Sequence, residues 1–191
     1  MFNDLSSPAA LMATRRSGKP RNMVSPGPDA AQLERILSAA IRVPDHGKLG
    51  PWRFVVIPQD KREAFAALPR TAAAEVPDAK DADPASITEF AHQAPCLIVV
   101  LSQPDRAAHI PVWEQELSAG AACMSLLIAA HAEGFVGGWL TGWAAYSDKV
   151  RDAFAGPDAR IAGFIFLGTS SRELSERPRP KYDAVVSTWG G

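Results

Sequence analysis

The sequence predicts a single domain, residues 1–191, in which helices pack on a β-sheet as an α/β or α+β sandwich. Two observations support this class. Short apolar runs rich in β-branched residues alternate along the chain with segments of helical periodicity. The composition, with 47% hydrophobic and 21% charged residues, is that of an ordinary globular protein, and 191 residues suffice for one sizeable core.

Four segments carry helical patterns. Residues 29–42 place apolar side chains on one face, and Asp29 is suited to cap the start of that helix. A second helix is expected at 61–68 and a short one at 147–154. The longest pattern, 111–133, is acidic in its first turns and then apolar on nearly all sides. Such a helix has to be buried.

Three apolar runs, 53–58, 96–101 and 161–168, are typical of buried strands. Residues 71–86 combine small residues, charges and prolines and predict a mobile loop. The strand-like segment 184–189 follows a polar arm with three prolines and would be unsupported at the end of a monomer. We therefore expect it to join the sheet of a second subunit.

Several classes of protein are disfavoured. Twenty basic and 21 acidic residues give a net charge of −1, so neither nucleic acid nor an anionic membrane is the expected partner. No apolar run reaches the roughly 18 residues that span a bilayer. The N-terminal charges follow the apolar piece, the reverse of a signal peptide, so we expect a cytoplasmic protein. Cys96 and Cys123 lie in apolar segments without metal-type spacing and predict buried thiols, with no disulfide or metal.

Two clusters of basic residues stand out in the stretches TRRSGKPR and ERPRPKYD. Adjacent guanidiniums beside a hydroxyl supply several hydrogen bonds to an oxyanion, and arginine matches the geometry of a phosphate. A solvated basic surface explains each cluster equally well when it is considered alone. The clusters consist of Arg15, Arg16, Lys19 and Arg21, and of Arg177, Arg179 and Lys181.

The loop IRVPDHGKLGPWRF, residues 41–54, holds more polar groups than a connector needs. Arg42 at a helix end is also explained by the helix dipole, and a loop histidine such as His46 is commonly a surface residue. The stretch GGWLTG, residues 137–142, can bring backbone close to a flat ligand, although a tight turn beside a core tryptophan is favoured in isolation. No hydrolase, P-loop or GxGxxG motif is present, so chemistry carried by a cofactor fits better.

Taken together, these pieces resemble the flavin-dependent nitroreductase family, and specifically its short, minimal branch of NAD(P)H nitroreductases. The similar features follow one another in order along nearly the whole chain. They are RRS (15–17), IRVPDH (41–46), PWRFVVI (51–57), APCLIVV (94–100), WEQELSAGAACM (113–124), GFVGGW (134–139) and FLGT (166–169).

The resemblance implies an α+β fold, a three-layer α/β/α sandwich around a central mixed sheet whose C-terminal strand is exchanged in a homodimer. It also implies FMN at the subunit interface. The residues that match the flavin-binding segments of the family are Arg15, Arg16, Ser17, Arg42, His46, Trp139, Leu140, Thr141, Arg177 and Arg179. Among these, Arg42 and His46 match a loop that reaches the flavin of the other subunit. A weaker match to a nicotinamide-binding segment covers Ala129, Ala130, His131, Ala132, Glu133 and Gly134.

The activity implied is transfer of hydride from NADH or NADPH, through flavin N5, to a small-molecule acceptor such as a nitroaromatic or quinone by a ping-pong cycle. The flavin carries the chemistry, and no side-chain acid is required. The residues PDH at 44–46 depart from the Pro-Ser-Ser of many relatives, which leaves the substrate open. The alternatives are a same-fold flavin reductase specialised for enoate reduction, dehalogenation or aromatisation, and a non-catalytic flavin-binding module.

Overall fold

The computed structural model describes residues 1–76 and 79–190. Its five strands form one sheet in the order β1-β5-β3-β2, and β4 also pairs with β5. The long strand β5 therefore lies at the centre, with β3 on one side and β4 and β1 on the other. The strands span Met23–Val24 (β1), Trp52–Ile57 (β2), Cys96–Ser102 (β3), Val136–Leu140 (β4) and Arg160–Ser170 (β5).

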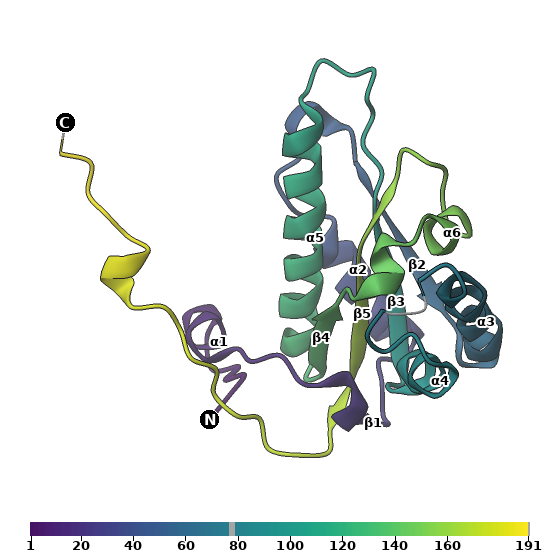
Figure 1. The fold of residues 1–191 in the computed structure, drawn as a ribbon. Coiled ribbons are helices and arrows are strands. Elements are labelled where there is room, and N and C mark those ends of the chain that lie inside the picture. The colour runs from purple at the N-terminus through teal and green to yellow at the C-terminus, as the bar shows by residue number, and fades with distance from the viewer. Residues whose placement is uncertain (77–78, 191) are drawn as a thin grey trace.

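Helices cover both faces of this sheet (Figure 1). The helices α2 and α5 pack on one face, and α3, α4 and α6 lie over the other. Short 3₁₀ turns occupy 20–22, 46–48, 59–61, 143–146 and 182–184. The helices are Pro8–Thr14 (α1), Ala30–Ala40 (α2), Arg62–Ala73 (α3), Pro84–His92 (α4), Val112–Ala132 (α5) and Asp148–Asp152 (α6).

The apolar runs form strands because their side chains alternate between two hydrophobic layers. Leu97 and Val99 of β3 point into the cluster under α3 and α4. Ile98 and Val100 of the same strand point into the cluster under α2 and α5. Both faces of β3 are buried throughout. The predicted α+β class and the three-layer α/β/α arrangement are thus confirmed.

All four predicted helices are present, and the one expected at 61–68 forms α3. The pattern at 29–42 forms α2, and the Asp29 side chain accepts a hydrogen bond from the backbone N–H of Gln32 in a capping box. The long apolar pattern forms α5, and the segment 147–154 forms α6.

The prediction of a loop at 71–86 is wrong in part. Residues 71–73 continue α3, and α4 begins at Pro84, with the Asp83 side chain accepting from two backbone amides. Proline is tolerated in a first helical turn, so Asp-Pro marks a helix start here rather than a loop. Residues 77–78 of that expected loop lie outside the described residues.

Two expectations for the sheet differ from the structure. All of the strand pairings between described residues are antiparallel, so the sheet is not mixed. The segment 184–189 forms no strand in this single chain; it follows a 3₁₀ turn at Tyr182–Ala184 and extends away from the body (Figure 1). A strand needs a neighbour for its backbone hydrogen bonds, and no strand of residues 1–76 and 79–190 pairs with this tail. Its exchange into a second subunit stays a prediction.

The cysteines behave as the sequence predicts. Both are free and buried, and burial raises the pKa of the Cys96 thiol to about 11 and that of Cys123 to about 12. Neither thiol is therefore ionised at neutral pH. Across residues 1–76 and 79–190, no cluster of metal-ligating side chains and no helix with the length and apolarity of a membrane span is found.

One buried cation ties three elements together. Arg62, which is fully buried, donates to the carbonyl oxygens of Ile57 at 3.0 Å, Ala91 at 2.7 Å and Pro95 at 3.3 Å. These carbonyls lie at the end of β2, in the last turn of α4 and just before β3. The guanidinium thus links backbone groups of three segments.

Replacing Arg62 by methionine should destabilise the fold by about 2–3 kcal/mol, because the Ile57 and Ala91 carbonyls lose the guanidinium donor and the Pro95 carbonyl keeps only Gln59, while the volume is roughly kept. Urea unfolding followed by circular dichroism measures this. Arg106→Met, which removes an exposed ion pair with Asp158, is the matched control and should change stability by less than about 0.5 kcal/mol. Equal stability of the two variants would contradict the role assigned to Arg62.

Candidate active site

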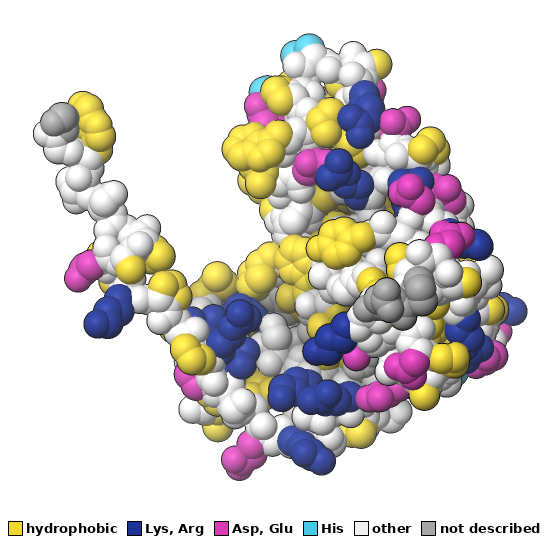
Figure 2. All heavy atoms as spheres, in the orientation of Figure 1, with side chains coloured by type: hydrophobic (Ala, Val, Ile, Leu, Met, Phe, Trp, Pro, Cys, Tyr) yellow, Lys and Arg dark blue, Asp and Glu magenta, His cyan; other side chains and the backbone are white. Residues whose placement is uncertain are grey.

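A cationic cavity forms where the segment after α1 meets the end of β4. The Gly18 amide donates to the Gly137 carbonyl at 3.1 Å, which fixes one segment against the other. The cavity has a volume of about 570 Å³. Figure 2 shows basic side chains gathered at the base of the C-terminal tail, beside the hollow between the tail and the body. Its lining residues are Arg15, Arg16, Ser17, Gly18, Lys19, Pro20, Met124, Leu127, Gly138, Trp139, Leu140, Thr141, Arg177 and Arg179.

Arg15 has fewer partners than its burial requires. One of its terminal nitrogens donates to Ser17 Oγ at 3.1 Å, whereas its Nε is buried without a hydrogen-bond partner among the described residues. Burial lowers the pKa of Arg15 most, and the positive charges of Arg179 and Arg16 lower it further. A buried donor and uncompensated like charges both favour an anion at this position.

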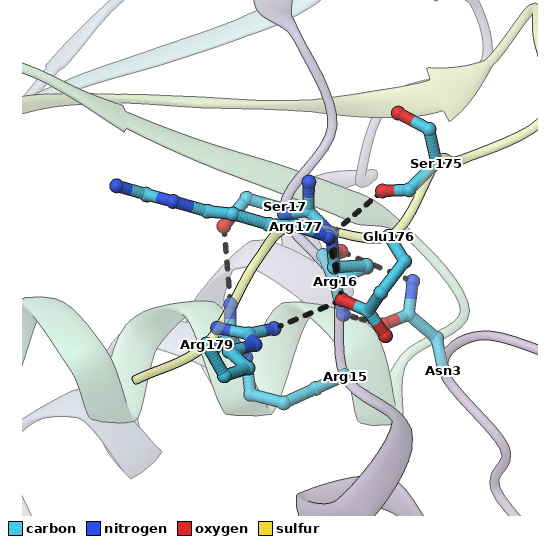
Figure 3. A network of polar contacts seen from close by, with 8 residues as sticks. All are labelled: Asn3, Arg15, Arg16, Ser17, Ser175, Glu176, Arg177 and Arg179. Carbon is cyan, nitrogen blue, oxygen red and sulfur yellow. Dashed lines mark hydrogen bonds and ion pairs between the residues drawn. The ribbon is translucent and has the colours of Figure 1, made fainter. Parts of the chain in front are cut away.

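Arg16 joins the N-terminal segment to the tail (Figure 3). Its Nε donates to the Ser175 carbonyl at 2.8 Å and lies 3.7 Å from the Glu176 carboxylate. Asn3 holds the backbone of Arg16 through its amide side chain. Glu176 also lies 3.5 Å from Arg179.

The cavity therefore brings four arginines together from opposite ends of the chain, with one neighbouring carboxylate. Because a single carboxylate cannot neutralise this cluster, its net charge is positive. The cavity brings together these residues from both basic clusters and from GGWLTG: Arg15, Arg16, Ser17, Trp139, Leu140, Thr141, Arg177 and Arg179.

A second cavity adjoins the first through the shared wall Trp139–Thr141. It has a volume of about 420 Å³ and is rich in aromatic and aliphatic side chains. Trp139 donates its Nε1–H to the Ala162 carbonyl at 3.0 Å. Its indole lies against Gly163 of β5, where a Cβ would be only 2.0 Å from the indole nitrogen. The residues that line this cavity are Pro69, Lys80, Asp81, Ser86, Ile87, Phe90, Trp139, Leu140, Thr141, Gly142, Trp143 and Ala144.

Arg42 and His46 do not line either cavity of this chain. Both are exposed, and the Nδ1 of His46 lies 2.7 Å from the Glu114 carboxylate in the first turn of α5. The loop between them has a defined shape, because Ser118 donates to the Pro44 carbonyl at 2.7 Å.

The segment Ala129–Gly134 forms the end of α5 and also lies outside both cavities. Glu133 accepts two hydrogen bonds from Arg35, at 2.8 and 2.7 Å. His131 is buried, with its Nδ1 3.0 Å from the Phe135 carbonyl. Burial lowers the pKa of His131, and the charge of Arg15 lowers it further, so the imidazole is neutral at pH 7.

Sequence reasoning did not assign six residues that line the cationic cavity: Gly18, Lys19, Pro20, Met124, Leu127 and Gly138. Lys19 lies among its cations, and Gly18 lies against β4. Lys19 belongs to the first basic cluster, so composition alone could have included it. The signal for Gly18 was weaker, since a glycine among basic residues is equally typical of a flexible surface loop.

A cationic cavity joined to an aromatic one, on a three-layer α/β/α sandwich, is suited to a flat ligand that ends in an anion. The chain belongs to the nitroreductase family, a family of oxidoreductases, and the match to the family covers residues 12–169. An Escherichia coli (strain K12) relative named "Putative NAD(P)H nitroreductase YdjA" is 40% identical over 167 residues, which cover 86% of this chain and 89% of the relative.

Solved structures share the fold. A nitroreductase-like family protein from Bacillus cereus superposes with a TM-score of 0.82 at 18% identity, over 97% of both chains. A nitroreductase with bound FMN from Bacteroides fragilis gives a TM-score of 0.69 at 18% identity, over 93% of this chain and 96% of the other. At these identities the likeness establishes the fold alone.

Gly138→Ala should destabilise the protein by about 1–3 kcal/mol, because a Cβ would lie 2.8 Å from the Gly18 carbonyl oxygen and 3.1 Å from Pro20, forcing β4 away from the cavity wall. Differential scanning calorimetry measures the shift in Tm. Gly120→Ala, in the interior of α5 with nothing within 4 Å, is the matched control and should raise the Tm through helix propensity. The prediction fails if both variants raise the Tm.

Proposed function

We propose that this protein is an FMN-dependent oxidoreductase that accepts hydride from NADH or NADPH and reduces nitroaromatics or quinones. The observation that carries the proposal is the pair of joined cavities, one lined by arginines and one by aromatic side chains. FMN has these two parts, a terminal phosphate and a flat ring system. The relative named as an NAD(P)H nitroreductase supports the choice of electron donor.

The residues of the cationic cavity fit a phosphate. The Nε of Arg15 is a buried donor without a partner among the described residues, and burial, followed by two neighbouring guanidiniums, lowers the pKa of Arg15. An added anion would satisfy the donor and offset the repulsion. Arg177 and Arg179 bring further cations on the tail, which Arg16 holds in place through the Ser175 carbonyl. Several arginines around one site match the three oxygens of a phosphomonoester.

The shared wall fits a flat ring. Trp139, Leu140 and Thr141 line both cavities, so a ligand held by its phosphate in the first would meet them with its ring system. When bound, FMN supplies reversible acceptance of a hydride. Ile87, Phe90 and Trp143 give the ring cavity an apolar part suited to an aromatic ring. Lys19, Arg15 and Arg16 provide the positive charge that stabilises negative charge near the ring.

The chain's own surface supports a homodimer. Val185, Val186 and Trp189 of the tail are exposed, as are Trp113 and Leu117 on α5. The strand β2 lies at the edge of the sheet and has a free hydrogen-bonding side.

An apolar groove runs beside this edge, between α2 and Phe54 of β2. A tail strand from a second copy would cover the edge and the groove together. The same association would carry the loop with Arg42 and His46 to the cavity of the other copy.

Purified protein should be yellow and release FMN rather than FAD on heating, because the basic cluster suits one terminal phosphate. Anaerobic NADH or NADPH should bleach the flavin, and a nitroaromatic or quinone should restore the colour. Both substrates are expected to use one site in turn, which gives parallel double-reciprocal lines in steady-state kinetics. A colourless protein that takes up no added FMN would refute the assignment, and flavin reduction without reoxidation by either acceptor class would refute the substrate.

Deleting the residues after Arg179 should convert the dimer to a monomer and release flavin, since the deletion removes the apolar tail that would cover the partner's sheet edge. Sedimentation velocity at low micromolar concentration measures the oligomeric state, and flavin absorbance measures occupancy. A chain that ends at Trp189 keeps the proposed strand and should remain dimeric. A stable dimer without the tail would contradict the strand exchange.

A further inference from the structure

The indole of Trp139 occupies a defined position where the two cavities meet. Trp139 lies in β4 and belongs to the wall that the cationic and the aromatic cavity share. It is 38% exposed. Exposed side chains usually exchange rotamers quickly, so an ordered indole at this position needs contacts that hold it.

Two contacts with β5 hold the indole. Its Nε1–H donates to the Ala162 carbonyl at 3.0 Å. The ring also lies against the next residue, because Gly163 has no side chain there. A Cβ at Gly163 would be 2.0 Å from Nε1 and 2.4 Å from Cδ1 of the indole, well inside van der Waals contact. The observed position of the indole and a side chain at residue 163 therefore exclude each other.

The pairing of the two strands explains why the glycine is needed at this position. Trp139 pairs with Ile165 in the antiparallel ladder, so Gly163 lies two residues along β5 on the same face of the sheet. A diagonal neighbour at this spacing is within reach of an aromatic side chain. Gly163 is buried and pairs with Val100 of β3. A glycine inside a strand weakens it and often marks such a close approach.

The held indole matters for the proposed flavin site. Because Trp139 lines both cavities, a change of its rotamer would change the shape of both at once. A wall that is already in place lets a flat ligand stack without first ordering a side chain, and this lowers the free-energy cost of binding. A freely rotating indole would have to be ordered each time a ligand binds.

We infer that Gly163 is a positioning residue of the candidate active site: its missing side chain lets Trp139 keep one position against β5 and so present a fixed wall to the ring of a bound flavin. The inference rests on the proposed FMN site. Gly163 is not among the described residues that line the two cavities. It acts on the ligand through Trp139 alone.

Gly163→Ala tests this role, and Gly156→Ala is the matched control because a Cβ at Gly156 meets nothing within 4 Å. Calorimetric titration of flavin-free protein measures the affinities for FMN and riboflavin. Gly163→Ala should weaken both by the same factor, about tenfold, since one aromatic contact to the ring is lost while the phosphate contacts are kept. Gly156→Ala should bind both flavins as the wild type does. Unchanged affinity of Gly163→Ala, or a loss confined to FMN, would overturn the inference.

A double variant separates the indole from the backbone of β4. A Cβ at Gly163 would also lie 3.2 Å from the Leu140 carbonyl oxygen, so Gly163→Ala has a second way to act, by moving β4. In a Trp139→Ala background the indole is absent, and adding Gly163→Ala should lower riboflavin affinity and Tm little further. A single variant that fails to fold, beside a double variant that folds, would support the same conclusion. A loss that is as large with Trp139→Ala as without it would overturn the inference.

A third measurement needs no flavin. The five tryptophans give indole ¹⁵N–¹H signals, and Trp139→Phe identifies the signal of Trp139. In Gly163→Ala this signal should shift and its proton should exchange faster with D₂O, because the bond to the Ala162 carbonyl is lost, while the other indole signals stay the same. An unchanged Trp139 signal would overturn the inference. A wild type that binds no FMN would refute the proposed function, and the indole signals would still decide whether Gly163 sets the position of Trp139.

Discussion

One electrostatic constraint dominates the site: arginines are concentrated in the partly buried cationic cavity, and the described residues around it carry fewer negative charges than positive ones. Two unit charges 4 Å apart interact by about 1 kcal/mol in water and about 4 kcal/mol near a protein surface. The fold has to hold Arg15, Arg16 and Arg179 together against this repulsion. Because Arg179 is far from Arg15 and Arg16 in the sequence, no single helix or strand can hold all three side chains. The sheet and the contacts of the C-terminal tail hold them together instead.

The sheet provides that restraint through β5. This strand is paired along both sides, and its central residues contribute to both hydrophobic layers. β4 pairs with β5 and carries Trp139 near its exposed end. The segment after α1 is hydrogen-bonded to Gly137 of β4. The tail begins at the end of β5 and returns past Arg16. The cationic end of the site thus takes its arginines from segments near the two chain termini, and the aromatic end is lined by α4 and by the residues at and after the end of β4.

The sequence predicted the layers well and the site in part. Long apolar runs and the periodic helices α2 and α5 are decided by burial, which local pattern reports directly. β4 was read as a turn because GGW is poor strand sequence; its Gly138 is required by the close approach of Gly18, a tertiary contact that no local pattern contains. Residues of both basic clusters line one cavity, although Arg21 and Lys181 do not. The single chain does not bring Arg42 and His46 to its own cavity, because the flavin proposed for this loop is the one bound by a second copy.

The central claim is that the arginine cavity holds the phosphate of FMN. Calorimetric titration of flavin-free protein with FMN and with riboflavin, which lacks only the phosphate, tests it most directly. Several charge-assisted hydrogen bonds at roughly 1.5–3 kcal/mol each predict that FMN binds at least about a hundredfold more tightly. Arg177→Ala should shrink that preference, and the remote control Arg106→Ala should leave it unchanged. Equal affinity of the wild type for the two flavins would contradict the account.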